Sequence, residues 1–293
     1  MSFIYKMLRK KNILLNDTKA NGNETIKEGD IIKLFLSEDT INKFQKETDF
    51  NFEKSPPLDI VDIILEDENI IILNKPKGIL SQPNSDKQNS LIDSVLSYLH
   101  EKGEYLPGNI QRPGLANRLD KNTNGLVICG KNLKALQALN AKETLINKYY
   151  FAIVKGKITE PNKHIGYITK ENDKNKVTIT KEATTNSKEI VTQYKPLEVL
   201  GDYTLVEILI TGGKPHQIRG VLSYLGHPIL GDPKYGGKVS NHNTLEINNQ
   251  ILQAYKLHFI NVPPPLNYLN NTIIKIEAGK DISKIIKSLK TKH

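Results

Sequence analysis

Short apolar runs separated by polar turns dominate the chain, and most of them have the period or the length of β-strands. Val61–Leu65 and Ile70–Leu73 lie on either side of a short acidic turn, a spacing that predicts a hairpin. Lys148–Val154 is apolar on both faces, so we expect it in the middle of a sheet. Further strands are predicted at residues 31–36, 177–180, 190–194 and 205–210.

Apolar residues at helical spacing predict fewer elements. Ser90 is a suitable N-cap for a helix in which Leu91, Val95 and Leu99 share one face. Gly103 is placed to end that helix in the left-handed conformation that glycine adopts easily. The same kind of pattern predicts helices over residues 4–9, 132–139, 216–225 and 282–289.

These elements divide the chain into three parts. Residues 1–40 form a small unit with a helix and short strands, and residues 41–58 are polar and end in Ser55-Pro56-Pro57, as linkers often do. Residues 59–293 hold the remaining elements. The sequence has no repeat and no regular alternation of strand and helix, so we expect an α+β fold with a mainly antiparallel or mixed sheet.

The composition is that of a globular protein with a basic surplus. Hydrophobic residues make up 38% and charged residues 25% of the 293 positions, which allows a sizeable core. The net charge of +9 indicates a polyanionic partner, most often nucleic acid. A solvated basic surface has the same surplus, and composition alone does not choose between the two.

Other classes of protein are disfavoured. No apolar run approaches the ~20 residues of a membrane-spanning helix. The residues Met1 to Lys6 lack the apolar segment and cleavage site of a secretory signal, so we expect a cytoplasmic protein without a membrane partner. The single cysteine, Cys129, lies in an apolar run and is expected to be a buried thiol. No neighbouring His or Cys has metal-ligand spacing, and no metal site is predicted.

The segment Asn117-Arg118-Leu119-Asp120-Lys121 carries the sharpest chemical signal. Asp120 lies between two cations just before an apolar run, and such a field keeps a carboxylate ionised. An ionised carboxylate is what nucleophilic attack on an electron-poor carbon requires. An ordinary ion pair at a turn has the same local pattern, and these residues alone favour that second interpretation.

A wider pattern changes this balance. Four segments follow one another along the chain: Asn74-Lys75-Pro76-Lys77-Gly78; Asn117 to Leu126; Lys148 to Gly156; and Gly213 to Arg219 with Gly226 to Asp232 and Tyr235-Gly236. In this order they resemble the signature segments of RluA-type pseudouridine synthases, which are Asn-Lys-Pro-x-Gly, His-Arg-Leu-Asp-x-x-Thr-Ser-Gly-Leu, Lys-x-Tyr-x-Ala-x-Val-x-Gly and Gly-Arg-x-His-Gln-Ile-Arg with Gly-His-Pro-Ile-x-Gly-Asp and Tyr-Gly. The resemblance extends from about Val61 to the C-terminus, and four segments in order are a specific signal.

The resemblance implies an enzyme that isomerises uridine to pseudouridine in RNA without a cofactor. Asp120 would be the catalytic carboxylate, acting either by adding to the nucleotide or by assisting the loss of uracil through a glycal-type intermediate. Tyr150 would stack on the flipped base and take part in the final proton removal, the alternative being a core tyrosine. Arg219 would pair with Asp120 and orient it, the alternative being a phosphate contact.

The resemblance also implies a set of RNA-binding residues. Arg118 would fill the gap left in the RNA stack by the flipped uridine, because the reacting atoms are inaccessible within the stack. His216 and His227 are expected to be structural or RNA-contacting rather than to transfer protons. The RNA-binding candidates are Arg118, Lys75, Lys148, His216, Arg9, Lys10 and Lys11.

Four positions depart from the family pattern. Asn117 stands where His is usual, Asn124 replaces Ser, Lys214 replaces Arg, and Gly220 replaces a larger residue. None of them is a proposed catalytic residue, so they bear on the choice of substrate rather than on the chemistry.

Residues 1–40 resemble the second half of an S4 RNA-binding domain. The match rests on the helix, the basic Arg9-Lys10-Lys11, the short strand with Asn16, and Glu28 to Ile32. The first helix of an S4 domain has no counterpart here. A plain docking module rich in β-structure is the alternative.

The leading hypothesis is therefore a monomeric pseudouridine synthase that acts on large-subunit ribosomal RNA, the choice of RNA resting on family analogy. One alternative is a transfer-RNA pseudouridine synthase of the same family. Another is a non-catalytic RNA-binding protein of the S4 type, against which the presence of Asp120, Tyr150 and Arg219 argues. A carboxylate glycosidase is more distant, because it needs a second carboxylate that nothing in the sequence indicates.

Overall fold

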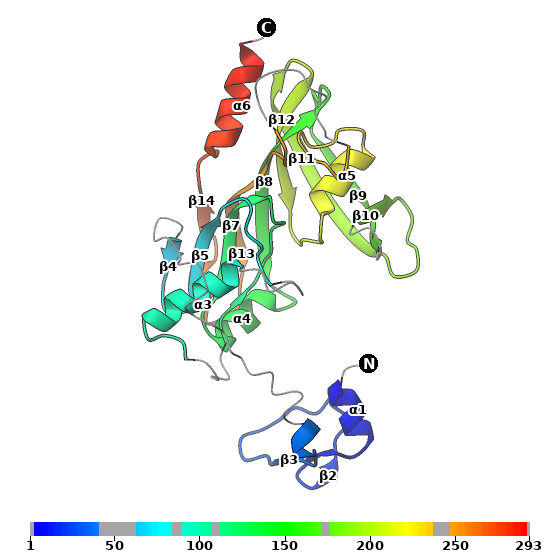
Figure 1. Cartoon of the computed structure of the whole chain (residues 1–293). Helices are drawn as coiled ribbons and strands as arrows, with labels where there is room; N and C mark the ends of the chain where they lie inside the picture. Colours follow the sequence, from blue (N-terminus) through cyan, green and yellow to red (C-terminus); the bar gives the residue numbers. More distant parts are fainter. Residues whose placement is uncertain are drawn as a thin grey trace. The chain divides into compact units, whose positions relative to one another are not determined.

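The computed structural model describes residues 3–40, 63–83, 90–106, 112–171, 176–236 and 247–291. The chain divides into two compact units, Met1–Phe50 and Asn51–His293 (Figure 1). The linker predicted at residues 41–58 and the first residues of the predicted hairpin lie outside the described part.

In its described residues the N-terminal unit contains the helix α1, a three-stranded sheet and helical residues at 38–40. Its elements are α1 (Phe3–Arg9), β1 (Ile13–Leu15), β2 (Thr18–Lys19) and β3 (Ile32–Leu34). The strands pair antiparallel in the order β2-β1-β3, and α1 buries Met7 and Leu8. The helix predicted at residues 4–9 is confirmed, and the strand predicted at 31–36 is present but shorter.

An 11-stranded sheet is the frame of the second unit. Its strands are β4 (Ile63–Glu66), β5 (Ile70–Lys75), β6 (Gly114–Leu115), β7 (Asn124–Gly130), β8 (Leu145–Lys155), β9 (Asn162–Glu171), β10 (Lys176–Thr180), β11 (Lys188–Leu200), β12 (Tyr203–Ile210), β13 (Leu252–Asn261) and β14 (Ile273–Lys275). The order is β10-β9-β11-β12-β8-β13-β7-β5-β4, with β14 beside β13 and β6 beside β7. Among the described strands every pairing is antiparallel except that of β13 with β7, which confirms the predicted fold class.

The strand predictions succeed where apolar residues are continuous. β8 lies between β12 and β13 and buries Ile153 and Val154 fully, as its two apolar faces predict. β9 and β13 were not predicted. β9 buries only two of its ten residues, and β13 is interrupted by polar residues. β11 runs through a bulge at Pro196 and is much longer than the predicted 190–194.

The helices of this unit are α3 (Leu91–Glu101), α4 (Leu133–Asn140), α5 (Gln217–Tyr224), α6 (Lys280–Lys290) and the short 3-10 helix η3 (Asn267–Leu269). Ser90 is the N-cap of α3, and its backbone N–H and hydroxyl both donate to the carboxylate of Asp93 at 2.9 and 2.8 Å. The Asn132 side chain accepts from the N–H of Ala135 at 2.9 Å at the start of α4. Gly103 follows α3 with φ 74°, as predicted.

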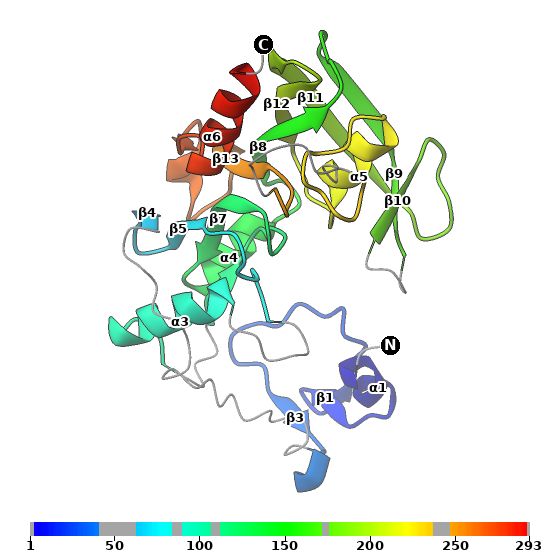
Figure 2. The same ribbon diagram turned by 45° about the horizontal axis from the view of Figure 1, so that its top comes forward.

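Apolar clusters attach these helices to the sheet. α4 packs on strands β5, β7, β8 and β13, α6 packs beside β8 and β12, and α5 covers β9, β10 and β11 (Figure 2). Cys129 is fully buried in β7, as predicted, and burial raises the pKa of its thiol to about 12. No described helix is long and apolar enough to cross a membrane.

Two glycines allow the chain to approach itself closely beside the loop that carries Asp120. Gly125 has φ 120°, and a Cβ there would lie 2.0 Å from the carbonyl oxygen of Ala254 in β13. Gly231 has φ 78°, and its Cβ would lie 2.3 Å from the carbonyl oxygen of Asn249. Any side chain at Gly125 therefore separates β7 from β13 at their parallel junction.

Gly125→Ala is expected to lower the free energy of unfolding by at least about 2 kcal/mol, because a strained φ and a backbone clash combine. Gly212→Ala is the matched control, since its Cβ would meet nothing within 4 Å. Urea denaturation of both variants makes the comparison. Equal stability of the two variants would contradict the close approach of β7 and β13.

Candidate active site

Asp120 lies in the loop between β6 and β7. The loop turns at Asp120, whose carbonyl accepts from the N–H of Thr123 at 3.0 Å. Asn117 fixes the start of the loop to β7, because its amide accepts from the N–H of Ile128 at 2.8 Å and donates to the carbonyl of Leu126 at 3.2 Å. Asn117, where the family pattern has His, therefore acts here as a backbone tie.

A second segment holds the same loop from the other side. The Ser81 hydroxyl donates to the carbonyl of Leu119 at 2.8 Å and accepts from the N–H of Leu119 at 3.0 Å. The N–H of Gly78 donates to the carbonyl of Lys121 at 2.9 Å. The Asn-Lys-Pro-x-Gly segment and the Asp120 segment are thus parts of one structure.

Lys75 lies at the centre of this junction. It is fully buried, and its ammonium donates to the carbonyls of Pro76, Ile79 and Lys121 at 2.9, 2.8 and 3.1 Å. Burial lowers the pKa of Lys75 to about 8, and the negative charge of Asp120 opposes that shift. The RNA-binding role predicted for Lys75 does not fit this geometry, because all three N–H groups of the ammonium are already used.

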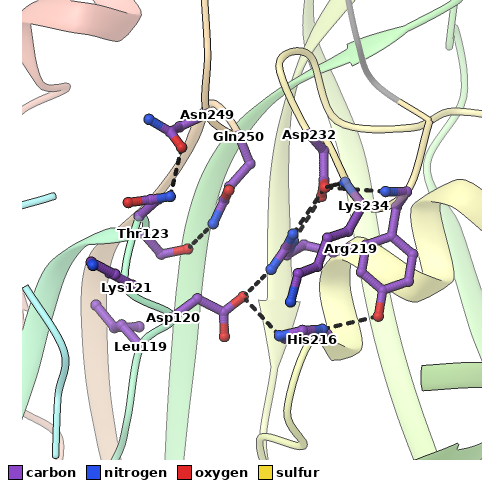
Figure 3. Close-up of polar contacts among 12 residues, drawn as sticks. Leu119, Asp120, Lys121, Thr123, His216, Arg219, Asp232, Lys234, Asn249 and Gln250 are labelled. Atoms are coloured by element: carbon purple, nitrogen blue, oxygen red, sulfur yellow. Dashed lines mark hydrogen bonds and ion pairs between the residues drawn. The ribbon is translucent and has the colours of Figure 1, made fainter. Parts of the chain in front are cut away.

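Arg219 reaches Asp120 from α5 (Figure 3). Its Nη1 donates to Oδ2 of Asp120 at 2.6 Å. Its Nε and Nη2 donate to the two carboxylate oxygens of Asp232 at 2.7 and 2.9 Å, a side-on bidentate pair. Arg219 is 5% exposed and Asp232 fully buried, whereas the side chain of Asp120 is 25% exposed. The pairing of Arg219 with Asp120 expected from the sequence is present in this geometry.

The pKa values in this group follow from burial and pairing. Burial opposes charge on Arg219, but the hydrogen bonds and charges of Asp232 and Asp120 outweigh it and raise the pKa of the guanidinium. Burial likewise opposes charge on Asp232, but the Arg219 hydrogen bonds and charge and two backbone N–H groups lower the pKa of that carboxyl. Arg219 and Asp232 therefore stay charged together in the interior.

Two residues of the 249–250 segment hold the far end of the Asp120 loop. Asn122 donates to the side-chain oxygen of Asn249 at 2.5 Å, and Gln250 donates to the hydroxyl of Thr123 at 3.2 Å. The contact of Gln250 with Thr123 is drawn in Figure 3. The loop that carries the Asp120 carboxylate is thus held at three places, by Asn117, by Ser81 and by the 249–250 segment.

Tyr150 lies on β8 and is 5% exposed. Burial raises the pKa of its hydroxyl, and the negative charge of Asp120 raises it further. The phenol is therefore neutral at neutral pH and can donate a proton in a hydrogen bond. Acting as the base in the final proton removal would require a change in these surroundings.

The remaining predicted residues lie in different settings. Arg118 is exposed, with Nη1 3.3 Å from Oε1 of Gln82. Lys148 is partly buried, donates to backbone carbonyls of residues 146, 211 and 212, and has its pKa lowered to about 8 by burial. Arg9, Lys10 and Lys11 are exposed at the end of α1. The described residues contain no group of three His, Cys, Asp or Glu that could hold a metal ion.

The sequence did not single out two members of the site. Asp232 and Tyr235 stand in the Gly-Asp and Tyr-Gly parts of the fourth segment, but no role followed from their positions. The N–H of Tyr235 donates to Asp232 at 3.2 Å, and its ring lies 5.2 Å from the guanidinium carbon of Arg219. The signal that could have found Asp232 was its place in the fourth segment, 13 residues after Arg219.

Comparison with known proteins identifies the class of enzyme to which this fold and site belong. Residues 69–224 match the family model described as RNA pseudouridylate synthase. A Mycoplasma capricolum protein named as an uncharacterized RNA pseudouridine synthase is 35% identical over 282 residues, covering 94% of this chain and 88% of the relative. The chain belongs to the RNA pseudouridylate synthase family.

A named relative and a solved structure agree with this. Ribosomal large subunit pseudouridine synthase C of Rickettsia conorii is 36% identical over 262 residues, covering 84% of this chain and 82% of the relative. The structure of human RNA Pseudouridylate Synthase Domain Containing 4 has the same fold, with a TM-score of 0.59 and 20% identity over 78% of this chain and 93% of that one. The protein is thus an RNA-modifying isomerase.

Arg219→Lys is expected to reduce the single-turnover rate at least about 10-fold while leaving RNA affinity nearly unchanged. Lysine keeps the charge but loses the planar fork that engages two carboxylates at once. The measurement is the single-turnover rate together with the RNA dissociation constant. Equal losses in both would indicate a phosphate contact instead.

Proposed function

We propose that this synthase uses the carboxylate of Asp120 to isomerise selected uridines in large-subunit ribosomal RNA. One observation carries the catalytic part. Oδ2 of Asp120 accepts from the buried Arg219, while Oδ1 accepts no hydrogen bond from the described residues. A carboxylate with one oxygen fixed and the other free is oriented to react with a substrate.

The reaction needs no outside group. The bond from N1 of uracil to C1′ of the ribose breaks, the base rotates, and a bond from C5 to C1′ forms. The proton on C5 is then lost, and N1 gains a proton. Asp120 begins this sequence either by adding to the nucleotide or by assisting departure of uracil, and Arg219 holds it in place in both cases.

The target uridine has to leave its stack before these atoms can be reached. Arg118 is exposed two residues before Asp120, so its side chain is available to occupy the vacated position. Tyr150 is neutral and close enough to Asp120 to feel its negative charge. Its ring offers a surface on which the flipped base can stack. These roles follow the family pattern and the position of each residue around Asp120.

The choice of ribosomal RNA is supported by relatives and by charge. The Rickettsia conorii relative is named for the ribosomal large subunit, and the net charge of +9 suits a polyanion. Such a substrate implies action in the cytoplasm. We propose a monomer, because Asp120, Arg219 and Asp232 all come from one chain. Transfer RNA is the second candidate.

The N-terminal unit is proposed to be an S4-like RNA anchor. Asn16 holds the residues just before β3, accepting from the N–H of Ile31 at 2.9 Å and donating to Asp30 at 2.8 Å. The exposed cations at the end of α1 are free to contact phosphates.

Asp120→Asn is expected to bind RNA with wild-type affinity and to form no detectable pseudouridine. The amide keeps the shape of the side chain but cannot supply the reacting anion. Pseudouridine mapping on large-subunit RNA incubated with each protein is the measurement. Activity above a few per cent of wild type would remove Asp120 from its role.

Tyr150→Phe is expected to bind RNA normally and to turn over slowly. The ring is kept for stacking, and only the hydroxyl is lost. Single-turnover kinetics on a short RNA substrate make the comparison. A wild-type rate would leave Tyr150 as a stacking or core residue.

Replacing Arg9, Lys10 and Lys11 by glutamine is expected to weaken RNA binding. The slope of log K against log salt concentration should also become shallower by roughly two to three units, since each lost phosphate contact contributes about 0.9 to that slope. The control replaces Lys19, Lys27 and Lys33 by glutamine, which removes the same amount of charge from the same unit. The rate on bound RNA should be unchanged in both. Identical salt slopes for the two triple variants would rule out an anchor at the end of α1.

A further inference from the structure

His216 has an unusual backbone and a position beside the reacting group. It is the N-cap of α5 and has φ 53°, in the left-handed region. That conformation costs a residue with a side chain about 1–2 kcal/mol, so surrounding contacts have to maintain it. The side chain is 12% exposed, and Figure 3 shows its ring turned toward Asp120.

The hydroxyl of Tyr235 determines where the proton of His216 lies. This oxygen accepts from the backbone N–H of Val177 at 2.9 Å, and a backbone N–H can only donate. Nδ1 of His216 lies 3.0 Å from the same hydroxyl. The hydroxyl hydrogen is satisfied when it points to Nδ1, which is then an acceptor without a proton. In the neutral ring the proton is therefore on Nε2.

Nε2 is the ring atom that faces the carboxylate. It lies 3.9 Å from Oδ2 of Asp120, the same oxygen that accepts from Nη1 of Arg219 at 2.6 Å. Two N–H groups from α5 and its cap are thus directed at one carboxylate oxygen. The other oxygen remains open to the substrate.

Burial is the main reason that His216 is neutral. Burial lowers the pKa of the imidazole, and the charge of Asp120 opposes that shift. The cations Arg219 and Lys234 lower the pKa further, and Asp232 opposes them. The ring can therefore donate a hydrogen bond at neutral pH without adding a positive charge beside Asp120.

We propose that His216 is a positioning residue, fixed by Tyr235 with its proton on Nε2, which holds Oδ2 of Asp120 together with Arg219 and so turns Oδ1 to the uridine. This rests on the proposed catalytic role of Asp120. The present 3.9 Å is longer than a hydrogen bond of about 2.9 Å, and a movement of roughly 1 Å on RNA binding closes it.

Histidine tautomers give a test that does not depend on activity. Long-range proton–nitrogen NMR of the ¹⁵N-histidine-labelled protein should show His216 with its proton on Nε2. His227 is an internal reference of the opposite kind, because its Nδ1 faces the carbonyl of Lys155 at 3.0 Å and has to donate. Tyr235→Phe should shift the His216 signals toward a mixture of tautomers, and Tyr98→Phe should not. A proton on Nδ1 of His216 in the wild type would overturn the proposal.

Two substitutions of His216 separate positioning from folding. Glutamine places an amide nitrogen near the former Nε2, whereas asparagine places one near the former Nδ1. Asparagine suits both an N-cap and a left-handed φ better than glutamine. A purely structural role therefore predicts that His216→Asn is the more active variant.

Positioning predicts the reverse order. His216→Asn should lower the single-turnover rate about 10- to 100-fold with RNA affinity unchanged, the loss expected for one hydrogen bond to a charged group. His216→Gln should stay within a few-fold of wild type, even if its melting temperature is lower. Equal rates for the two variants, or a faster His216→Asn, would overturn the proposal. Asp120→Asn is run in parallel, because its activity tests the proposed function separately.

Discussion

The structure around the site depends on the buried ion pair between Arg219 and Asp232. A charge removed from water is costly unless it is paired and hydrogen-bonded, and breaking a buried pair costs about 3–5 kcal/mol. Arg219 meets this condition with three donated hydrogen bonds, and Asp232 also accepts from the backbone N–H groups of Lys234 and Tyr235. The pair fixes α5 to the turn after Gly231, and the guanidinium is rigid before any substrate arrives.

The loop that carries Asp120 is positioned by strand pairing. β5 and β7 are antiparallel neighbours, and Lys75 at the end of β5 lies opposite Gly125 at the start of β7. The segment that leaves β5 and the loop that enters β7 therefore meet at the same edge. Lys75 and Ser81 join them through carbonyls and N–H groups of the loop. The two sequence segments occur together because they form one junction.

Local chemistry was predictable from the sequence, and tertiary partners were less so. The caps at Ser90 and Asn132 depend on residues three positions away, so the pattern alone located them. The family resemblance placed Lys75 among the RNA-binding candidates, and its burial follows from a junction that spans 46 residues of sequence. β13 was not predicted because polar residues interrupt its apolar pattern. Its burial comes from its two neighbours in the sheet, β7 and β8.

Arg219 shares its hydrogen bonds between two carboxylates, and this explains how it orients Asp120 without compensating the negative charge of Asp120. Asp232 takes two of the guanidinium hydrogen bonds and Asp120 takes one. Arg219 and Asp232 together are neutral, so Asp120 supplies a full negative charge to the site. Had Arg219 formed its bidentate pair with Asp120 instead, both oxygens would be occupied and the anion compensated. The buried Asp232 therefore makes it possible for one arginine to hold the carboxylate and still leave an oxygen for the uridine.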